Sequence, residues 1–94
     1  MPGITLQSRV RRADDAAWRL IDGQAVIVSS SSQRMRVLNE VGSRIWDMAQ
    51  GQSLGAIAEA VGAEFEADSA RIEADVLAFA EDLVGRGMLV LEDK

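Results

Sequence analysis

The spacing of hydrophobic positions changes near residue 39 and divides the chain into two parts. Before this point, apolar residues occur in short runs rich in β-branched side chains, and turn-forming residues separate the runs. After it, apolar residues recur every three or four positions, which is the spacing of one helix face. The pattern predicts an α+β fold in which a three-stranded antiparallel sheet is followed by three helices.

The first part predicts three strands that fold back on one another. They cover residues 17–21, 24–29 and 34–38. Asp22-Gly23 separates the first two strands, and both residues tolerate the positive φ angles of a two-residue hairpin turn. Four polar residues, 30–33, are expected to form the second turn. The three strands would form an antiparallel meander.

The ends of the chain are less regular than its centre. Residues 1–13 show little periodicity and are expected to form a flexible N-terminal arm or an edge segment. Residues 14–94 are then expected to form a single domain. Within it, the apolar run 88–91 fits a short closing strand or an apolar tail.

Asn39 marks the start of the first helix, because its side-chain oxygen can accept a hydrogen bond from an unpaired amide of the first turn. Glycine inside a helix costs about 1 kcal/mol relative to alanine, so Gly42 is expected to have a packing reason. The simplest is room for the Trp46 ring or for a neighbouring backbone. The helix is expected to end near Ala49, with Gly51 as its left-handed cap.

Two further helices are expected after the first. Ser53 can cap the second helix, whose regular part is expected to end at Gly62, and Asp68 or Ser69 can cap the third. The core stripe of the third helix consists of Ile72, Val76, Phe79 and Leu83. The short loop between the first two helices predicts a winged helix-turn-helix-like arrangement.

The amino-acid composition excludes most kinds of catalytic site. The chain has no histidine and no cysteine, and its one lysine is Lys94. Without these residues there is no usual zinc site, no thiol nucleophile and no Ser-His pair. The glycines match neither dinucleotide-binding nor P-loop spacing. The chain is therefore expected not to be an enzyme and to hold no metal or cofactor.

The same composition bears on location. No apolar run reaches the roughly 18 residues of a membrane helix, and the N-terminus lacks the apolar core of a signal peptide. A cytoplasmic location with no membrane contact is expected, and the absence of cysteine fits it.

Charge is distributed unevenly along the chain. Residues 1–46 carry seven arginines against four acids, whereas residues 47–94 carry three basic residues against eleven acids. Helix-turn-helix folds often bind DNA, but affinity for DNA depends on Lys and Arg that neutralise phosphates. The third helix, 68–86, has five acids against two arginines. A duplex would be repelled, so nucleic acid is not the expected partner.

An edge strand offers another kind of binding, because its unpaired amides and carbonyls can take up an extended peptide as a further strand. If residues 34–38 form an edge beside the third helix, a groove lies between them. The candidate peptide-binding residues are Arg34, Met35, Arg36, Val37 and Leu38 on the strand, and Asp75, Ala78, Phe79, Asp82 and Arg86 on the helix.

Two alternatives to direct peptide contact stay open. The apolar members of this set can equally be core residues, with the arginines only solvated. The exposed edges, together with a stripe formed by Leu77 and Val84, can also pair two copies of the chain. Both a monomer and a homodimer fit the sequence.

A series of short motifs runs through most of the chain. It consists of Leu38-Asn39-Glu40-Val41-Gly42, Ile45-Trp46, Gly51, Ile57, Val61, Phe65, Asp75-Val76, Phe79, Leu83 and Gly87-Met88-Leu89. In this order and spacing, residues 17–91 resemble the PqqD-like proteins, the superfamily of pyrroloquinoline quinone biosynthesis protein D.

The resemblance implies a winged helix-turn-helix fold that binds peptide instead of DNA. Such proteins bind the leader of a ribosomally made precursor peptide between the third strand and the third helix. They present it to a modifying enzyme, often a radical S-adenosylmethionine protein, and this chain has the length of members that act as separate chains.

One position departs from the members that serve quinone synthesis. Those proteins typically carry Cys-Asp-Gly after the first helix, where this chain has Ala49-Gln50-Gly51. The resemblance therefore leaves open a different modified peptide, including a lasso-type one.

Overall fold

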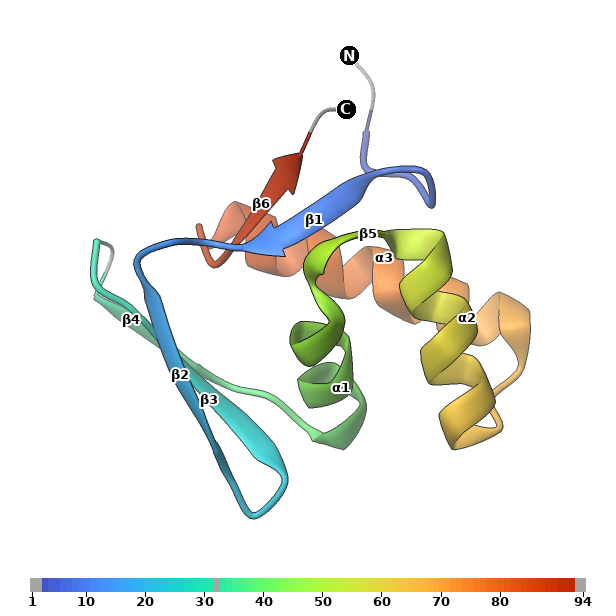
Figure 1. Ribbon diagram of the computed structural model, residues 1–94, viewed down its shortest axis with the longest axis horizontal. Helices are drawn as coiled ribbons and strands as arrows, with labels where there is room; N and C mark the ends of the chain where they lie inside the picture. Colours follow the sequence, from blue (N-terminus) through green and yellow to red (C-terminus); the bar gives the residue numbers. More distant parts are fainter. Residues whose placement is uncertain (1–2, 32, 93–94) are drawn as a thin grey trace.

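The computed structural model describes residues 3–31 and 33–92, and it has an α+β fold with two small sheets and three helices (Figure 1). The elements are β1 (Arg9–Arg12), β2 (Ala16–Ile21), β3 (Gln24–Ser29), β4 (Arg34–Val37), α1 (Glu40–Met48), β5 (Gln50–Ser53), α2 (Leu54–Phe65), α3 (Ser69–Gly85) and β6 (Leu89–Glu92). Lys94 and the residue before it, at the end of the expected domain, lie outside the described residues, as do residues 1–2 of the expected arm and residue 32 of the 30–33 turn.

The predicted meander is confirmed as an antiparallel sheet with the strand order β2-β3-β4. Its first turn has the expected geometry, because Asp22 and Gly23 have φ angles of 53° and 80°, as a two-residue hairpin turn requires. One face of the sheet packs on α1 through the buried Ala25 and Ile27. In Figure 1, this sheet lies on one side of α1 and α2 lies on the other.

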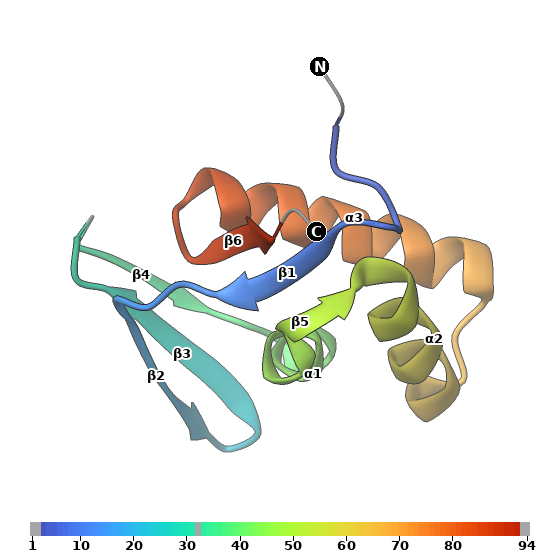
Figure 2. The same cartoon turned by 45° about the horizontal axis from the view of Figure 1, so that its top comes forward.

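A second sheet, with the order β5-β1-β6, was not foreseen. Residues 9–12 were expected within a flexible arm or edge segment, but they form β1, the central strand of this sheet (Figure 2). β1 pairs with the distant β6 from Arg9↔Glu92 to Arg12↔Leu89. Its sequence gives no strand signal because only one of its four residues, Val10, is apolar. β6 confirms the predicted closing strand.

The helix starts follow the predicted caps. The Asn39 side chain accepts a hydrogen bond from the Gly42 N–H at 2.7 Å, and Ser53 and Asp68 cap α2 and α3 in the same way. The predicted end of α1 near Ala49 is confirmed, but the predicted cap of this helix is wrong. Ala49 caps α1, whereas Gly51, with a φ of 98°, lies within β5.

The second helix is also longer than the sequence suggested, because α2 continues through Gly62 to Phe65. Glu66 follows in the left-handed conformation, with a φ of 54°, and its N–H donates to the Gly62 carbonyl. None of the helices in the described part of the chain is both long and apolar enough to cross a membrane.

A buried aromatic cluster joins β1, β2 and α1. The rings of Trp18 and Trp46 meet edge to face with 6.0 Å between their centroids. The Arg12 guanidinium lies 5.0 Å from the Trp18 ring centre, and its Nη1 donates to the Trp46 carbonyl at 3.1 Å. These contacts fix the end of β1 against the helical part of the domain.

The loop that leads into β4 is held by Asp15. Its carboxylate accepts a hydrogen bond from the Ser31 N–H at 3.0 Å, and the Ser30 hydroxyl donates to the Asp15 carbonyl. The hydroxyl and the backbone N–H of Ser31 hold the pKa of the Asp15 carboxyl below its ordinary value of 3.8.

This pKa shift predicts a pH dependence of folding. A carboxyl with a lowered pKa in the folded state stabilises the fold above its unfolded-state pKa, and this effect is lost as the pH falls through the folded-state pKa. The native protein is therefore expected to melt at a higher temperature than Asp15→Asn near neutral pH. The difference between the two melting temperatures should shrink as the pH falls below 3.8, the ordinary pKa of this carboxyl. A difference that persists at low pH would show that the carboxylate charge is not its cause.

Candidate peptide-binding groove

β4 forms an open edge of its sheet, as predicted. It pairs with β3 from Val26↔Val37 to Ser29↔Arg34, and the Leu38 N–H donates to the Ala25 carbonyl at 2.9 Å. Residues of an antiparallel strand point their N–H and C=O groups alternately toward and away from their partner strand. The backbone groups of Arg34 and Arg36 alternate in step with those of Leu38 and therefore point toward β3. The backbone groups of Met35 and Val37 point away from β3.

The side chains of β4 alternate as well. Met35 and Val37 point to the outer face of the sheet, where they are 66% and 54% exposed. Arg34 and Arg36 point to the inner side, the side of Ile27 and of the helices. An added strand would therefore hydrogen-bond to Met35 and Val37 and would direct half of its side chains toward α3.

An ion-pair cluster connects β4 to α3. Nη2 of Arg36 lies 2.7 Å from one carboxylate oxygen of Asp82, and Nε of Arg86 lies 2.9 Å from the other. The buried Nε of Arg36 has no hydrogen-bond partner among the described residues. Asp82 is thus shared between two arginines, and the cluster leaves a net positive charge on this part of the groove.

We expect the Arg36–Asp82 pair to contribute little to folding stability, because both side chains are partly exposed. A double-mutant cycle of Arg36→Ala and Asp82→Ala, followed by urea unfolding, should give a coupling energy of about 0.5–1 kcal/mol that decreases in high salt. A coupling energy of zero would mean that the pair does not hold β4 against α3.

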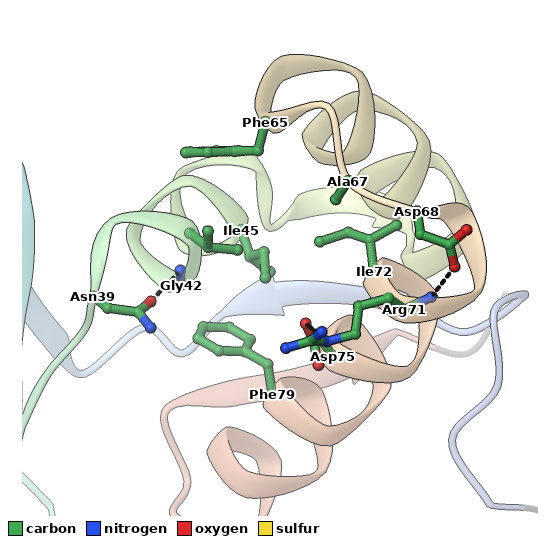
Figure 3. Close-up of a pocket in the computed structure, with 11 residues that line it drawn as sticks. Asn39, Gly42, Ile45, Phe65, Ala67, Asp68, Arg71, Ile72, Asp75 and Phe79 are labelled. Carbon is green, nitrogen blue, oxygen red and sulfur yellow. Dashed lines mark hydrogen bonds and ion pairs between the residues drawn. The ribbon is translucent and has the colours of Figure 1, made fainter.

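Next to the end of β4, a hollow of about 930 Å³ opens between α1, α3 and the segment that joins α2 to α3 (Figure 3). Its lining consists of Asn39, Val41, Gly42, Ile45, Phe65, Ala67, Asp68, Arg71, Ile72, Asp75 and Phe79. Figure 3 shows Ile45 between the rings of Phe65 and Phe79, and Ile72 to one side of them near Ala67. Arg71 and Asp75 form an exposed ion pair at 3.7 Å. The hollow is therefore apolar between its rings and charged along one side.

Gly42 shapes this hollow. A Cβ atom at Gly42 would lie 3.1 Å from Oδ1 of Asn39 and 3.2 Å from Cε2 of Phe79. The packing reason expected for this glycine is confirmed, but the neighbours are the Phe79 ring and the Asn39 side chain rather than Trp46. The absence of a side chain at position 42 lets the Phe79 ring lie against α1.

The structure brings most of the predicted site residues together and separates one from them. Leu38 is a core residue, only 4% exposed, and its N–H is used within the sheet. It is therefore not available to a ligand, because its leucine side chain completes the core below β4. Ala78 is exposed on α3, one turn from Asp75 and from Asp82. Arg34 is exposed and has no ion pair among the described residues.

Sequence reasoning missed the α1 side of the site. The hollow includes Gly42 and Ile45 of α1, together with Phe65 at the end of α2. The sequence predicted a packing role for Gly42 and no ligand contact for any of the three. The unusual glycine inside a helix was the available signal, but the sequence does not say which side chain approaches it. Among the described residues, no group of three His, Cys, Asp or Glu side chains could hold a metal ion.

Comparison with known proteins agrees with this geometry. The family described as "Coenzyme PQQ synthesis protein D (PqqD)" matches residues 24–89. The chain belongs to the PqqD family. The match runs from the first residue of β3 to the first residue of β6, so both walls of the groove lie inside the PqqD region. Comparison with curated proteins gives no match.

Two solved structures have the same fold as this PqqD-family chain. "TbiB1 in Complex with the TbiA(beta) Leader Peptide" has 27% sequence identity and a TM-score of 0.78, and the match covers 89% of this chain and 96% of that one. "Lasso peptide synthetase B1 complexed with the leader peptide" has 22% identity and a TM-score of 0.77, over 87% and 98% of the two chains. The second likeness is evidence of fold alone.

Proposed function

We propose that this chain binds the leader segment of a ribosomally made precursor peptide and presents it to a modifying enzyme. The observation that carries the proposal is the open edge of β4 beside the hollow on α3. Membership of the PqqD family and the likeness to TbiB1 bound to a leader peptide support it. The chain would act as a peptide chaperone without catalysis of its own.

The edge of β4 determines how such a peptide would bind. It would pair with the backbone groups of Met35 and Val37, and its alternate side chains would face α3. An apolar side chain fits the hollow that Phe65, Phe79 and Ile45 line. An acidic side chain would be attracted to the exposed Arg34. We therefore expect a leader with a large apolar residue and a carboxylate a few residues apart.

Membership of the PqqD family indicates the class of the modifying enzyme. PqqD-like proteins often serve radical S-adenosylmethionine enzymes, and such an enzyme is our proposed partner. The sequence Ala49-Gln50-Gly51 differs from the Cys-Asp-Gly of members that make the quinone. The proposed precursor is thus a different modified peptide, and a lasso-type precursor is compatible with this difference.

A titration with the precursor peptide encoded nearby tests the function. The labelled leader is expected to bind with a dissociation constant in the micromolar range or below, and the amide resonances of Met35 and Val37 should shift the most. A scrambled leader of equal composition serves as the control. Equal binding of both peptides, or no binding at high micromolar concentration, would contradict the proposal.

The charge of α3 argues against DNA as the ligand. This helix and its cap carry Asp68, Glu73, Asp75, Glu81 and Asp82. Two of the three most C-terminal carboxylates, those of Asp75 and Asp82, lie in the groove itself. Because arginines pair with both of these carboxylates, the repulsion of a phosphate backbone would come from α3 and its caps as a whole, which carry five acids against two arginines over residues 68–86.

A further inference from the structure

The outer face of the β2-β3-β4 sheet is apolar, although none of the helices in the described residues covers it. The strand register places three rows of side chains on this face. They are Ala17–Val28–Met35, Arg19–Val26–Val37 and Ile21–Gln24. Of the six large hydrophobic side chains that are exposed in the described part of the chain, four lie in these rows.

Such a face is unusual for an antiparallel sheet with only one packed side. The solvent side of such a sheet normally carries polar residues that alternate with the core residues. Here the core side is formed by Ala25 and Ile27, and the opposite side is apolar too. Single exposed hydrophobic residues are common, but contiguous rows of them mark interaction surfaces. Figures 1 and 2 show the helices on the other side of this sheet.

The charge of the face indicates what kind of partner fits it. Arg19 is the one charged residue in the three rows, and no carboxylate accompanies it. In a symmetric dimer, this face of one copy would pack against the same face of the other copy. Each Arg19 would then be buried against a face that offers it no acid. A different protein, with an apolar surface that carries a carboxylate, fits the face better.

The face also continues into the proposed peptide site. A peptide added to β4 would become the next strand, and its alternate side chains would stand beside Met35 and Val37 on the outer face. The bound peptide would thus enlarge the apolar surface by one strand. A protein docked on this surface would contact the sheet and the peptide together.

We propose that the outer face of the β2-β3-β4 sheet, with rows led by Ala17, Arg19 and Ile21, is the docking surface for the enzyme that modifies the bound peptide. The enzyme contributes an apolar surface with a carboxylate for Arg19. Because the peptide strand completes the surface, the enzyme binds the loaded chain more tightly than the empty one. This last statement rests on the proposed function, whereas docking on the bare sheet does not.

Neighbouring residues on β2 provide a matched test. Ile21 and Leu20 are 51% and 59% exposed, but they point to opposite faces of the sheet. We would compare Ile21→Gln/Val28→Gln with Leu20→Gln, and include Arg19→Glu as a charge reversal. The probe is the purified peptide-modifying enzyme encoded beside this chain. Its affinity is measured by calorimetry with and without leader, and leader affinity and melting temperature are measured for each variant.

The expected result is a loss of enzyme affinity of about tenfold or more in Ile21→Gln/Val28→Gln and in Arg19→Glu, with Leu20→Gln unchanged. Leader affinity and melting temperature should stay close to those of the native protein. Leader should strengthen enzyme binding by the native chain.

Three outcomes would overturn the docking surface. They are equal enzyme affinity in all variants, no enzyme binding by the native chain, and a dimer in light scattering that the Ile21→Gln/Val28→Gln variant abolishes. The last would mean that a second copy covers the face. Failure of the native chain to bind leader would instead count against the proposed function. The docking surface would still be tested in that case, by comparing the enzyme affinities of the variants without leader.

Discussion

Replacing Val37 with proline is expected to weaken leader binding by about 10- to 100-fold while the domain stays folded. The Val37 N–H points to the open edge of β4, so proline removes a donor that an added strand would use and that β3 does not use. A peptide carbonyl would lose its partner and would meet the proline ring. Proline is tolerated at such positions of edge strands.

The matched control for this variant is Val37→Ala, which trims the same side chain but keeps the N–H. Its leader affinity should stay within a few-fold of the native value, and both variants should keep the native circular dichroism spectrum. Equal affinities for proline and alanine at position 37 would show that the peptide does not pair with β4 there. The binding site would then have to be sought elsewhere on the domain.

Val10→Asp is expected to destabilise the domain by about 3–5 kcal/mol, which is a large part of the stability of a protein of this size. Val10 is 0% exposed at the centre of the β5-β1-β6 sheet. A carboxylate placed there would lose its hydration among the apolar side chains of the core cluster to which Val10 belongs. Thermal unfolding should show a melting temperature lower by at least about 15 °C.

Gln7→Asp provides the control, because it adds the same carboxylate to an exposed position of the same segment. Its melting temperature should change by only a few degrees. If Val10→Asp melted like Gln7→Asp, residues 9–12 would behave as the loose arm that the sequence suggests, and β1 would not be part of the cooperative fold.

The sequence predicts turns and helix caps correctly, because these features depend on residues only a few positions apart. Asp22-Gly23 allows positive φ angles and thereby fixes the hairpin between β2 and β3. Asn39, Ser53 and Asp68 each cap the helix that was predicted from them, since a cap depends on residues only three positions apart. The family motifs predicted the PqqD family, and the family match over residues 24–89 confirms it.

Elements that depend on distant partners could not be predicted in this way. β1 and β5 are four residues each, with few apolar side chains, and they become strands because β1 pairs with both β5 and the far end of the chain. Leu38 was placed in the groove by its position after β4, yet the burial of its side chain is a property of the assembled core. The extension of α2 past Gly62 was missed because the left-handed cap at Glu66 is unusual for that residue type.

The sequence by itself therefore determined the α+β class, the meander, the three helices and the acidic composition of the chain. Only the tertiary structure decided which backbone groups of β4 are free, that Asp82 is shared by Arg36 and Arg86, and that Gly42 admits the Phe79 ring into a hollow. The physical reason is the range of the interactions. Caps, turns and periodicity act over a few residues, whereas the groove is made by strands and helices that meet only after the chain has folded.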